Sequence, residues 1–224
     1  MKRRRWLASC LLVAGSGSAQ LAPRSLLAAV TAALTTEPDR ATHFLPLFPL
    51  GIVAFPGELV PLHIFEPRYK QLISESADNG MRFGVVTFFQ GGLASVGTEM
   101  KLERTLRKYE DGKMDIVTRG LRVFRLKSFQ HDVEGKLYSG GQVSYGKNDP
   151  SFEPDAQAVL VQSYNRMTQR AGSRRLIAAP YPENLSFFIG HDVGLTQAQE
   201  LQLLAMPVER ERQAYLIQHL SRTR

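Results

Sequence analysis

The stretch that decides the fold is FLPLFPLGIVAFPGELVPLHIFEPRYKQLI, residues 44–73. Its apolar residues predict one strand in two pieces over 45–55 and a second strand over 59–65, joined by a turn at Pro56-Gly57. Both strands contain prolines, which lack a backbone N–H, so we expect them at sheet edges or at bulges. The stretch therefore predicts the irregular opening of a β structure.

A helix is predicted directly after the second strand. Pro67 is suited to the first position of a helix, where its missing N–H costs nothing. Tyr69, Leu72 and Ile73 then form an apolar stripe, and Gly80 is a typical residue for ending a helix. These signals predict a helix from Pro67 to Asn79.

The middle of the chain predicts further short strands and a compact β barrel or sandwich. Asp111-Gly112 is a strong hairpin signal between two of them. A change of composition after Asp149-Pro150 marks the expected domain boundary. The predicted strands cover 82–89, 96–109, 113–118, 121–126 and 138–145.

Four helices with short connections are predicted beyond this boundary, so the fold class is α+β, a β barrel or sandwich with a C-terminal helical bundle. Local capping signals mark their ends. They are a helix over 155–170, a short helix capped by Asn184, a helix over 197–206 whose capping box is Thr196 and Gln199, and a last helix opened by Pro207.

Several motifs, taken together, resemble the LON substrate-binding domain, the amino-terminal domain of Lon proteases, which also occurs as a free-standing protein. They are LPLFPL at 45–50, FPG at 55–57, HIFEPRY at 63–69, VGT at 96–98, DG at 111–112 and GLRVFRL at 120–126. The resemblance spans 44–220. It implies a PUA-like β subdomain over 41–150 and a helical bundle over 151–224, used to bind protein rather than to cut it.

The polar members of the most distinctive motif, His63, Glu66 and Arg68, could form a binding pocket. A structural role is the favoured interpretation, because Glu66 favours the positive end of the following helix and Arg68 can pair with a carboxylate. His63 can fill a hydrogen bond at the strand end. The weak binding candidates, all family markers, are Pro56, Gly57, His63, Phe65, Glu66, Arg68 and Tyr69.

No catalytic residue, cofactor site or metal site is predicted. Residues 141–148, GQVSYGKN, match most of a phosphate-binding P-loop but lack the hydroxyl residue that follows Lys147 in that motif. No G-x-S-x-G elbow is present. The sole cysteine is Cys10, and the five histidines show no ligand spacing. The ATPase and serine-lysine protease domains of full-length Lon proteases are expected to be missing, because the chain ends before either would start.

Two function classes stay open. The first is a non-catalytic protein-binding module, which could serve as an adaptor in protein quality control. It would bind unfolded or extended polypeptides, or a protease partner, in an apolar groove between the β domain and the bundle. The second is an RNA-binding PUA-like module, which the acidic residues among the basic ones disfavour. Its candidate contacts are Arg104, Arg107, Lys108, Arg119, Arg122 and Arg125.

The net charge of +7 comes mostly from the start of the chain. Residues 1–36 hold five of the 28 basic residues and no acid, which leaves 23 basic against 21 acidic residues elsewhere. Residues 1–40 are interpreted as a leader or flexible extension, with a signal peptide over 1–19 as one possibility. We expect a cytoplasmic protein if the extension is no signal, and export after cleavage near Ala19 if it is. Its apolar stretches are too short to span a bilayer of about 30 Å.

Overall fold

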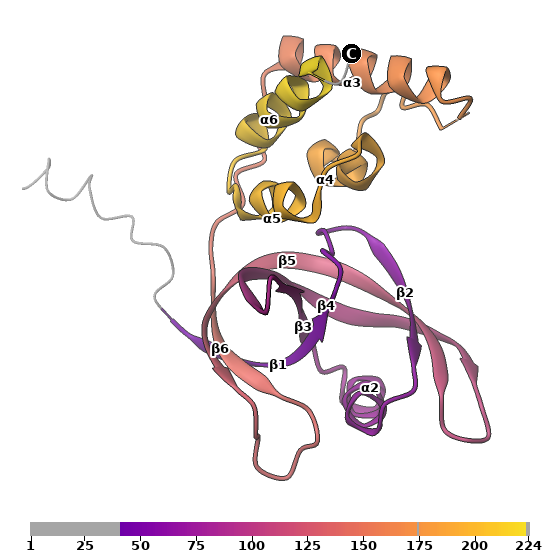
Figure 1. The fold of residues 1–224 in the computed structure, drawn as a ribbon, viewed down its shortest axis with the longest axis vertical. Coiled ribbons are helices and arrows are strands. Elements are labelled where there is room, and N and C mark those ends of the chain that lie inside the picture. Colours follow the sequence, from indigo (N-terminus) through magenta and orange to yellow (C-terminus); the bar gives the residue numbers. More distant parts are fainter. Residues whose placement is uncertain (1–40, 174, 223–224) are drawn as a thin grey trace, which may run out of the picture. The chain divides into compact units, whose positions relative to one another are not determined.

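The computed structural model describes residues 41–173 and 175–222, so the predicted leader over 1–40, with Cys10, lies outside the described residues. The strands come first, with one helix between the second and the third, and the other helices follow (Figure 1). The elements are β1 (His43–Leu50), β2 (Leu59–Ile64), α2 (Pro67–Asn79), β3 (Phe83–Phe89), β4 (Gly92–Lys108), β5 (Met114–Gln130), β6 (Gly140–Tyr145), α3 (Pro154–Arg170), α4 (Leu185–Ile189), the 3-10 helix η1 (Gly190–Val193), α5 (Gln197–Ala205) and α6 (Glu209–Arg222).

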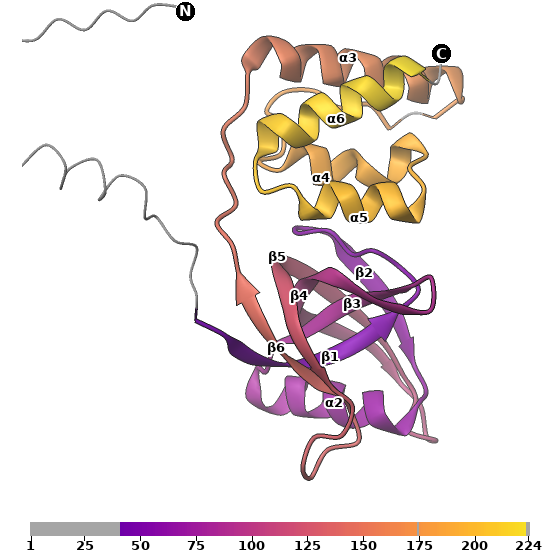
Figure 2. The ribbon, with the colours of Figure 1, turned by 60° about the vertical axis from the view of Figure 1, so that its left-hand side comes forward.

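The six strands form one sheet that closes on itself. Their order is β2-β5-β4-β3-β1-β6, and β5 pairs with β6 as well, so five strands make a barrel and β2 lies outside it on β5. β1 and β3 are parallel, whereas the other pairs are antiparallel. Figures 1 and 2 show α2 on the side of the barrel away from α3–α6. The predicted α+β class is confirmed, with the barrel rather than the sandwich.

The two proline-containing strands differ in their place in the sheet. β2, with Pro61, is an edge strand as expected. The expectation is wrong for β1, which lies between β3 and β6. Its first half, with Pro46, pairs with β6, and its second half, with Pro49, pairs with β3. Each half of β1 thus has a strand partner on one side only. A proline, which lacks a backbone N–H, can therefore lie in either half with its nitrogen on the unpaired side.

The second piece of the first predicted strand does not form. β1 ends at Leu50, and residues 51–55 run as an irregular segment. Two side-chain hydroxyls bind the backbone carbonyls of this segment: Thr87 donates to the Ile52 oxygen (2.9 Å) and Thr98 to the Ala54 oxygen (2.5 Å). These bonds replace a strand ladder, so the buried backbone stays satisfied without a strand.

The two strands predicted over 113–118 and 121–126 are one long strand, β5. It continues through Gly120, where a Cβ atom would lie 2.2 Å from the Phe55 carbonyl oxygen. The Gly57 N–H donates to the Gly120 oxygen (2.9 Å), and the Gly120 N–H donates to the Glu58 oxygen (2.9 Å). The glycine thus lets β5 pass close beneath the β1–β2 turn without breaking.

The helical part matches the prediction with two corrections. The capping box of Thr196 and Gln199 is present at α5. Asn184 precedes α4 but makes no side-chain cap hydrogen bond, and the last helix begins at Glu209 rather than at Pro207. The carbonyl of Pro207 instead accepts the Asp149 N–H (2.8 Å). The division of the chain near residue 150 stays a prediction.

None of the helices within the described residues has the length and apolarity that crossing a membrane requires. Within the same residues, no three His, Cys, Asp or Glu side chains come together as potential metal ligands.

The buried side chains gather in three clusters. Two consist of residues from the first part of the chain, which runs from β1 to β6 and includes α2. They fill the barrel and its contact with α2. The third fills the space among α3–α6 and also contains Val53, Phe55 and Val96 from the barrel part of the chain. Phe55 is fully buried, and its ring lies 5.3 Å from that of Phe187 in α4. The helices therefore complete their core with residues that the barrel supplies.

Candidate functional site

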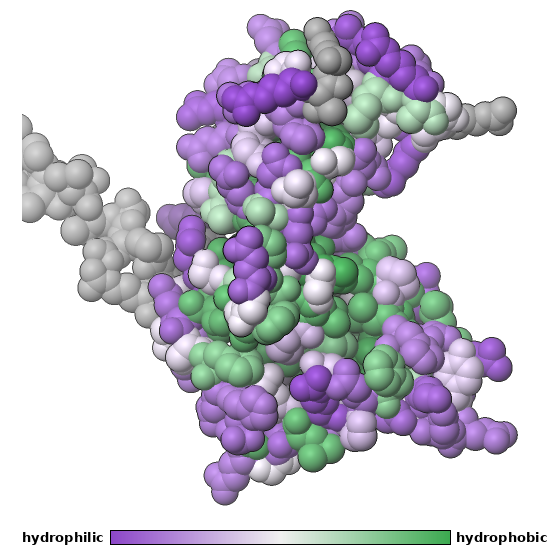
Figure 3. Space-filling model, in the orientation of Figure 1, coloured by the Kyte–Doolittle hydropathy of each residue, from purple (hydrophilic) through white to green (hydrophobic). Residues whose placement is uncertain are grey.

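A groove of about 800 Å³ runs between the β1–β2 turn and the segment that holds α4 and η1. On the face shown in Figure 3, apolar surface gathers on the barrel beneath the helices. The size lies within the range of ligand sites, which is roughly 300–1,000 Å³. The lining residues are Pro56, Gly57, Glu58, Leu59, Arg119, Arg175, Pro182, Glu183, Asn184, Phe187, Phe188, His191 and Asp192.

The groove presents apolar side chains from both walls. Leu59, at the start of β2, is 43% exposed, and Phe188 in α4 is 46% exposed. Phe187, the neighbour of Phe188, is buried and packs on Phe55. Because consecutive helical residues point about 100° apart, one phenylalanine anchors α4 to the core while the other remains available to a ligand. Apolar side chains that line a concave site are typical of ligand-binding sites.

Both arginines that line the groove are paired with carboxylates. Arg175 binds Asp192 (3.0 Å), and its guanidinium lies 5.3 Å from the centre of the Phe188 ring. Arg119 binds both carboxylate oxygens of Glu103 at 3.2 Å. The groove therefore has no uncompensated block of positive charge, and its charges frame an apolar centre.

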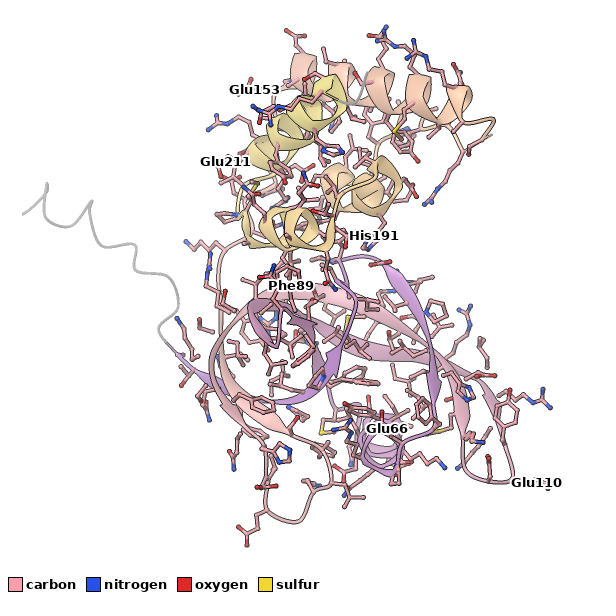
Figure 4. All side chains as sticks on the ribbon, in the orientation of Figure 1. Glu66, Phe89, Glu110, Glu153, His191 and Glu211 are labelled. Carbon is pink, nitrogen blue, oxygen red and sulfur yellow. The ribbon has the colours of Figure 1, made fainter. Side chains whose placement is uncertain are left out.

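His191 joins the two walls of the groove. Its Nδ1 lies 2.7 Å from Glu200 Oε1 in α5, and its Nε2 lies 3.2 Å from Glu58 Oε2 in the β1–β2 turn. The imidazole also packs on Phe55, with 4.5 Å between the ring centres. Burial lowers the pKa of His191, but its hydrogen bonds to Glu58 and Glu200 outweigh burial and raise the pKa to about 9. Figure 4 shows His191 where the helices meet the barrel.

Two further hollows adjoin the groove. One, of about 660 Å³, shares Pro182 and Glu183 with it and is also lined by Phe152 and Tyr181. The other, of about 110 Å³, shares Pro56 and Asn184 with it and is also lined by residues of β5 and by the segment after α5. The segment that ends at Asn184 thus borders all three hollows, so a ligand longer than one groove could continue along it.

The predicted binding candidates fall into two separate groups. Pro56 and Gly57 form the turn on one wall of the groove, and Gly57 has the left-handed φ of 84° that the turn requires. The other candidates lie at the far end of β2 and the start of α2; in Figure 4, Glu66 lies beside α2, on the side of the barrel away from His191. They are His63, Phe65, Glu66, Arg68 and Tyr69.

The polar members of this second group have local partners. His63 Nδ1 lies 2.6 Å from Asp115 Oδ1 on β5, and Arg68 binds Glu66 (2.7 Å). These contacts match the structural roles expected for them, although the assignment of binding residues itself stays a prediction. Phe65, by contrast, is 56% exposed.

The neighbouring Tyr69 has a clear place in the core. It is buried, and its ring stacks on that of Phe48 at 3.8 Å. Burial is the largest cause that raises the pKa of Tyr69 above its usual range. The residue therefore holds α2 on the barrel, and its phenol stays neutral at physiological pH.

Several of the arginines considered for RNA binding are neutralised or engaged. Besides the Arg119–Glu103 pair, Arg122 binds the buried Glu99 (2.8 Å), and its guanidinium lies 3.5 Å from the centre of the Tyr145 ring. Arg125 donates to the Ala205 carbonyl (3.4 Å). These contacts use charges that phosphate binding would need.

No motif or spacing pattern indicated the groove residues that come from the helical part. Phe187 and Phe188 lie in a segment that is predicted only as a short helix capped by Asn184, and Arg175 lies in a loop. His191 and Glu58 are 133 positions apart, so no spacing pattern links them. The doublet Phe187-Phe188 is a signal, because consecutive helical residues point about 100° apart and two large rings on one short helix need not both be buried.

A closed barrel with helices beside it and an apolar groove at their junction defines a β-barrel binding module. The chain belongs to the LON substrate-binding domain family, because the model described as "ATP-dependent protease La (LON) substrate-binding domain" matches residues 44–222. The matched domain is the substrate-binding one and not a catalytic one. This finding confirms the resemblance seen in the sequence motifs.

Solved structures agree with this assignment. The crystal structure of a Lon N-terminal domain protein from Xanthomonas campestris is 26% identical, with a TM-score of 0.62, over 79% of this chain and 98% of that chain. The N-terminal domain of Mycobacterium avium complex Lon protease shares the fold, with 19% identity and a TM-score of 0.60 over 80% of this chain and 98% of that chain.

Proposed function

We propose that this protein is a non-catalytic module that binds extended, apolar segments of unfolded polypeptides, called clients below, in the groove between the β1–β2 turn and α4. The observation that carries the proposal is the pair Leu59 and Phe188, which expose apolar surface from opposite walls of one groove. Membership in the substrate-binding family supports a polypeptide as the ligand.

The size and charge of the groove favour an extended segment over a folded partner or RNA. A volume of about 800 Å³ accommodates a few side chains of an extended chain, not a folded domain. The paired charges along it, such as Arg175 with Asp192, leave little attraction for phosphate. Binding should therefore depend weakly on salt, whereas RNA binding would fall steeply as salt displaces it.

The test is fluorescence anisotropy with the full chain and a labelled peptide of about twelve residues, long enough to outreach the groove. One peptide alternates leucine and phenylalanine with serine, and a matched peptide replaces every apolar residue by serine. Phe188→Ser and Leu59→Ser should each weaken binding of the apolar peptide about tenfold, because each removes roughly 1.4 kcal/mol of apolar burial. The all-serine peptide should not bind.

Val159→Ser is the matched control, since Val159 is 47% exposed on α3 and does not line the groove. It should bind as the wild type does, and circular dichroism checks that all variants are folded. Equal weakening by Val159→Ser, or equal binding of both peptides, would refute the groove assignment. A labelled RNA oligonucleotide that binds more tightly than the peptide, with a steep salt dependence, would support the RNA alternative instead.

An adaptor role in protein quality control follows as the second part of the proposal. A module that holds clients without cutting them can raise the concentration of clients at a protease. The measurement is the degradation rate of an unfolded client by a purified Lon-type protease, with and without this chain. Phe188→Ser should abolish any acceleration, whereas an acceleration that survives this substitution would place the adaptor surface elsewhere.

A further inference from the structure

We infer that His191 is the residue that sets the spacing of the groove walls, so that client affinity depends on whether its imidazole carries two protons. The device consists of Glu58, His191 and Glu200 and is called the His191 clasp. The inference rests on the proposed function for its binding readout, and it adds a regulation that the proposed function does not contain.

Each nitrogen of the imidazole meets a carboxylate on a different element. Nε2 faces Glu58 of the β1–β2 turn, and Nδ1 faces Glu200 of α5. A neutral imidazole has one donor and one acceptor, whereas the doubly protonated ring has two donors. Only the charged form can therefore donate to both carboxylates at once. In the neutral form one lone pair would point at a carboxylate oxygen, and that contact would be repulsive.

The clasp connects directly to the walls that bind the client. Glu58 Oε2 also accepts the Phe55 N–H (2.9 Å), which fixes the carboxylate relative to the turn. Phe55 lies against both His191 and Phe187. A change in the His191 contacts therefore acts on the turn and on α4, the two elements that carry the exposed apolar side chains of the groove.

The other charged groups around η1 are engaged elsewhere. Asp192 binds Arg175 and accepts the Tyr164 hydroxyl (2.8 Å). Arg119 across the groove binds Glu103. His219 of α6 contacts the carbonyl of Val193 (2.9 Å), on the side of η1 that faces the bundle. Loss of one of the two imidazole protons of His191 would thus leave Glu58 and Glu200 without the cation that they share.

The direction of the pH effect follows from the raised pKa. His191 titrates near 6.5 when unfolded and at about 9 in the fold. The stabilising contribution of the clasp is therefore fully present below about pH 6.5, still largely present at neutral pH, and lost as the pH rises through about 9. The groove should be held at its binding width at neutral pH and released at alkaline pH.

The experiment measures binding of the uncharged apolar peptide between about pH 7 and about pH 10, with both peptide ends blocked so that only the protein titrates. Wild-type affinity should fall about tenfold across this range, with a midpoint near 9. His191→Gln should bind about tenfold more weakly already at neutral pH and show no such midpoint. Glu200→Gln should keep the midpoint but move it to lower pH.

The matched control is His131→Gln, because His131 also pairs with a carboxylate, Asp132, but lies outside the groove. It should reproduce the wild-type profile. A wild-type profile without a midpoint, or His191→Gln with the wild-type profile, would overturn the clasp.

A second measurement keeps the two proposals apart. NMR of histidine-labelled protein follows the His191 imidazole directly, without any peptide. A His191 midpoint well above 7 supports the clasp even if no peptide binds, in which case the proposed function alone fails. A midpoint near 6.5 overturns the clasp whatever the peptide does.

Discussion

The barrel and the helical part of this protein bury their apolar residues in different ways. The barrel fills two clusters with its own residues and those of α2. The helices build one cluster and take Val53, Phe55 and Val96 from the barrel to complete it. The core of the barrel is thus built from its own residues and α2, whereas the core of the helical part also needs residues of β4 and of the segment that follows β1. The groove lies at the junction where the helices pack on these barrel residues. A change in one wall of the groove should therefore affect the other wall.

The two parts also differ in how they accommodate buried charge. In the barrel, Glu99 is buried, but its partners Arg82 and Arg122 are about half exposed. In the helices, Glu209 and Arg212 are both completely buried, and Ser186 donates to the same carboxylate. A charged partner that reaches water can be rehydrated when its ion pair is lost, whereas a fully buried one cannot. Removal of one partner of the ion pair should therefore cost more stability in the helical part than in the barrel.

The largest effect should come from Phe55→Ala. Phe55 is fully buried between the barrel and the helices, so its truncation should cost about 4 kcal/mol of the free energy of unfolding. Hydrogen exchange should show that α4–α6 lose protection while the barrel strands keep theirs. Phe83→Ala, within a barrel cluster, is the control and should reduce protection in the barrel as well. Equal loss of protection everywhere after Phe55→Ala would show that the two parts do not differ in self-sufficiency.

Glu209→Gln should lower the free energy of unfolding slightly less than Phe55→Ala does. The substitution leaves the guanidinium of Arg212 buried without its carboxylate, which should cost about 3 kcal/mol in urea unfolding. Glu99→Gln removes a carboxylate that is buried as well, but its arginine partners can turn to water, so the cost should be nearer to about 1 kcal/mol. Similar costs for both substitutions would mean that exposure of the partner does not decide the penalty.

Local signals predicted much of this molecule. The Pro-Gly turn, the helix from Pro67 to Gly80, the hairpin at Asp111-Gly112 and the capping box at Thr196 depend on residues a few positions apart, and the structure contains all of them. The spacing of the strands predicted a barrel or sandwich followed by helices, and the motifs that resemble the LON substrate-binding domain implied a PUA-like β subdomain in the same order.

The errors arose where distant residues decide the outcome. The prolines of β1 predicted a sheet edge or a bulge, but β1 lies inside the sheet, because β3 and β6 pair with different halves of it. Residues 51–55 look like a strand by composition, yet hydroxyls from Thr87 and Thr98 satisfy their backbone. The His191 clasp joins residues far apart in the chain. Such contacts exist only after folding, so no local pattern could indicate them.

The smallest effect separates a helix cap that forms from one that does not. Thr196 accepts the Gln199 N–H and completes a capping box at α5, so Thr196→Ala should cost about 1 kcal/mol in thermal or urea unfolding. Asn184 was predicted as a cap but makes no such bond at α4, and its side chain only contacts that of Asn148 at the surface (3.1 Å). Asn184→Ala should therefore cost clearly less than Thr196→Ala. A larger cost for Asn184 would mean that α4 depends on the residue that precedes it more than the contacts of Asn184 indicate. The packing of Phe187 on Phe55 would then contribute less to the stability of the helical part than its burial implies.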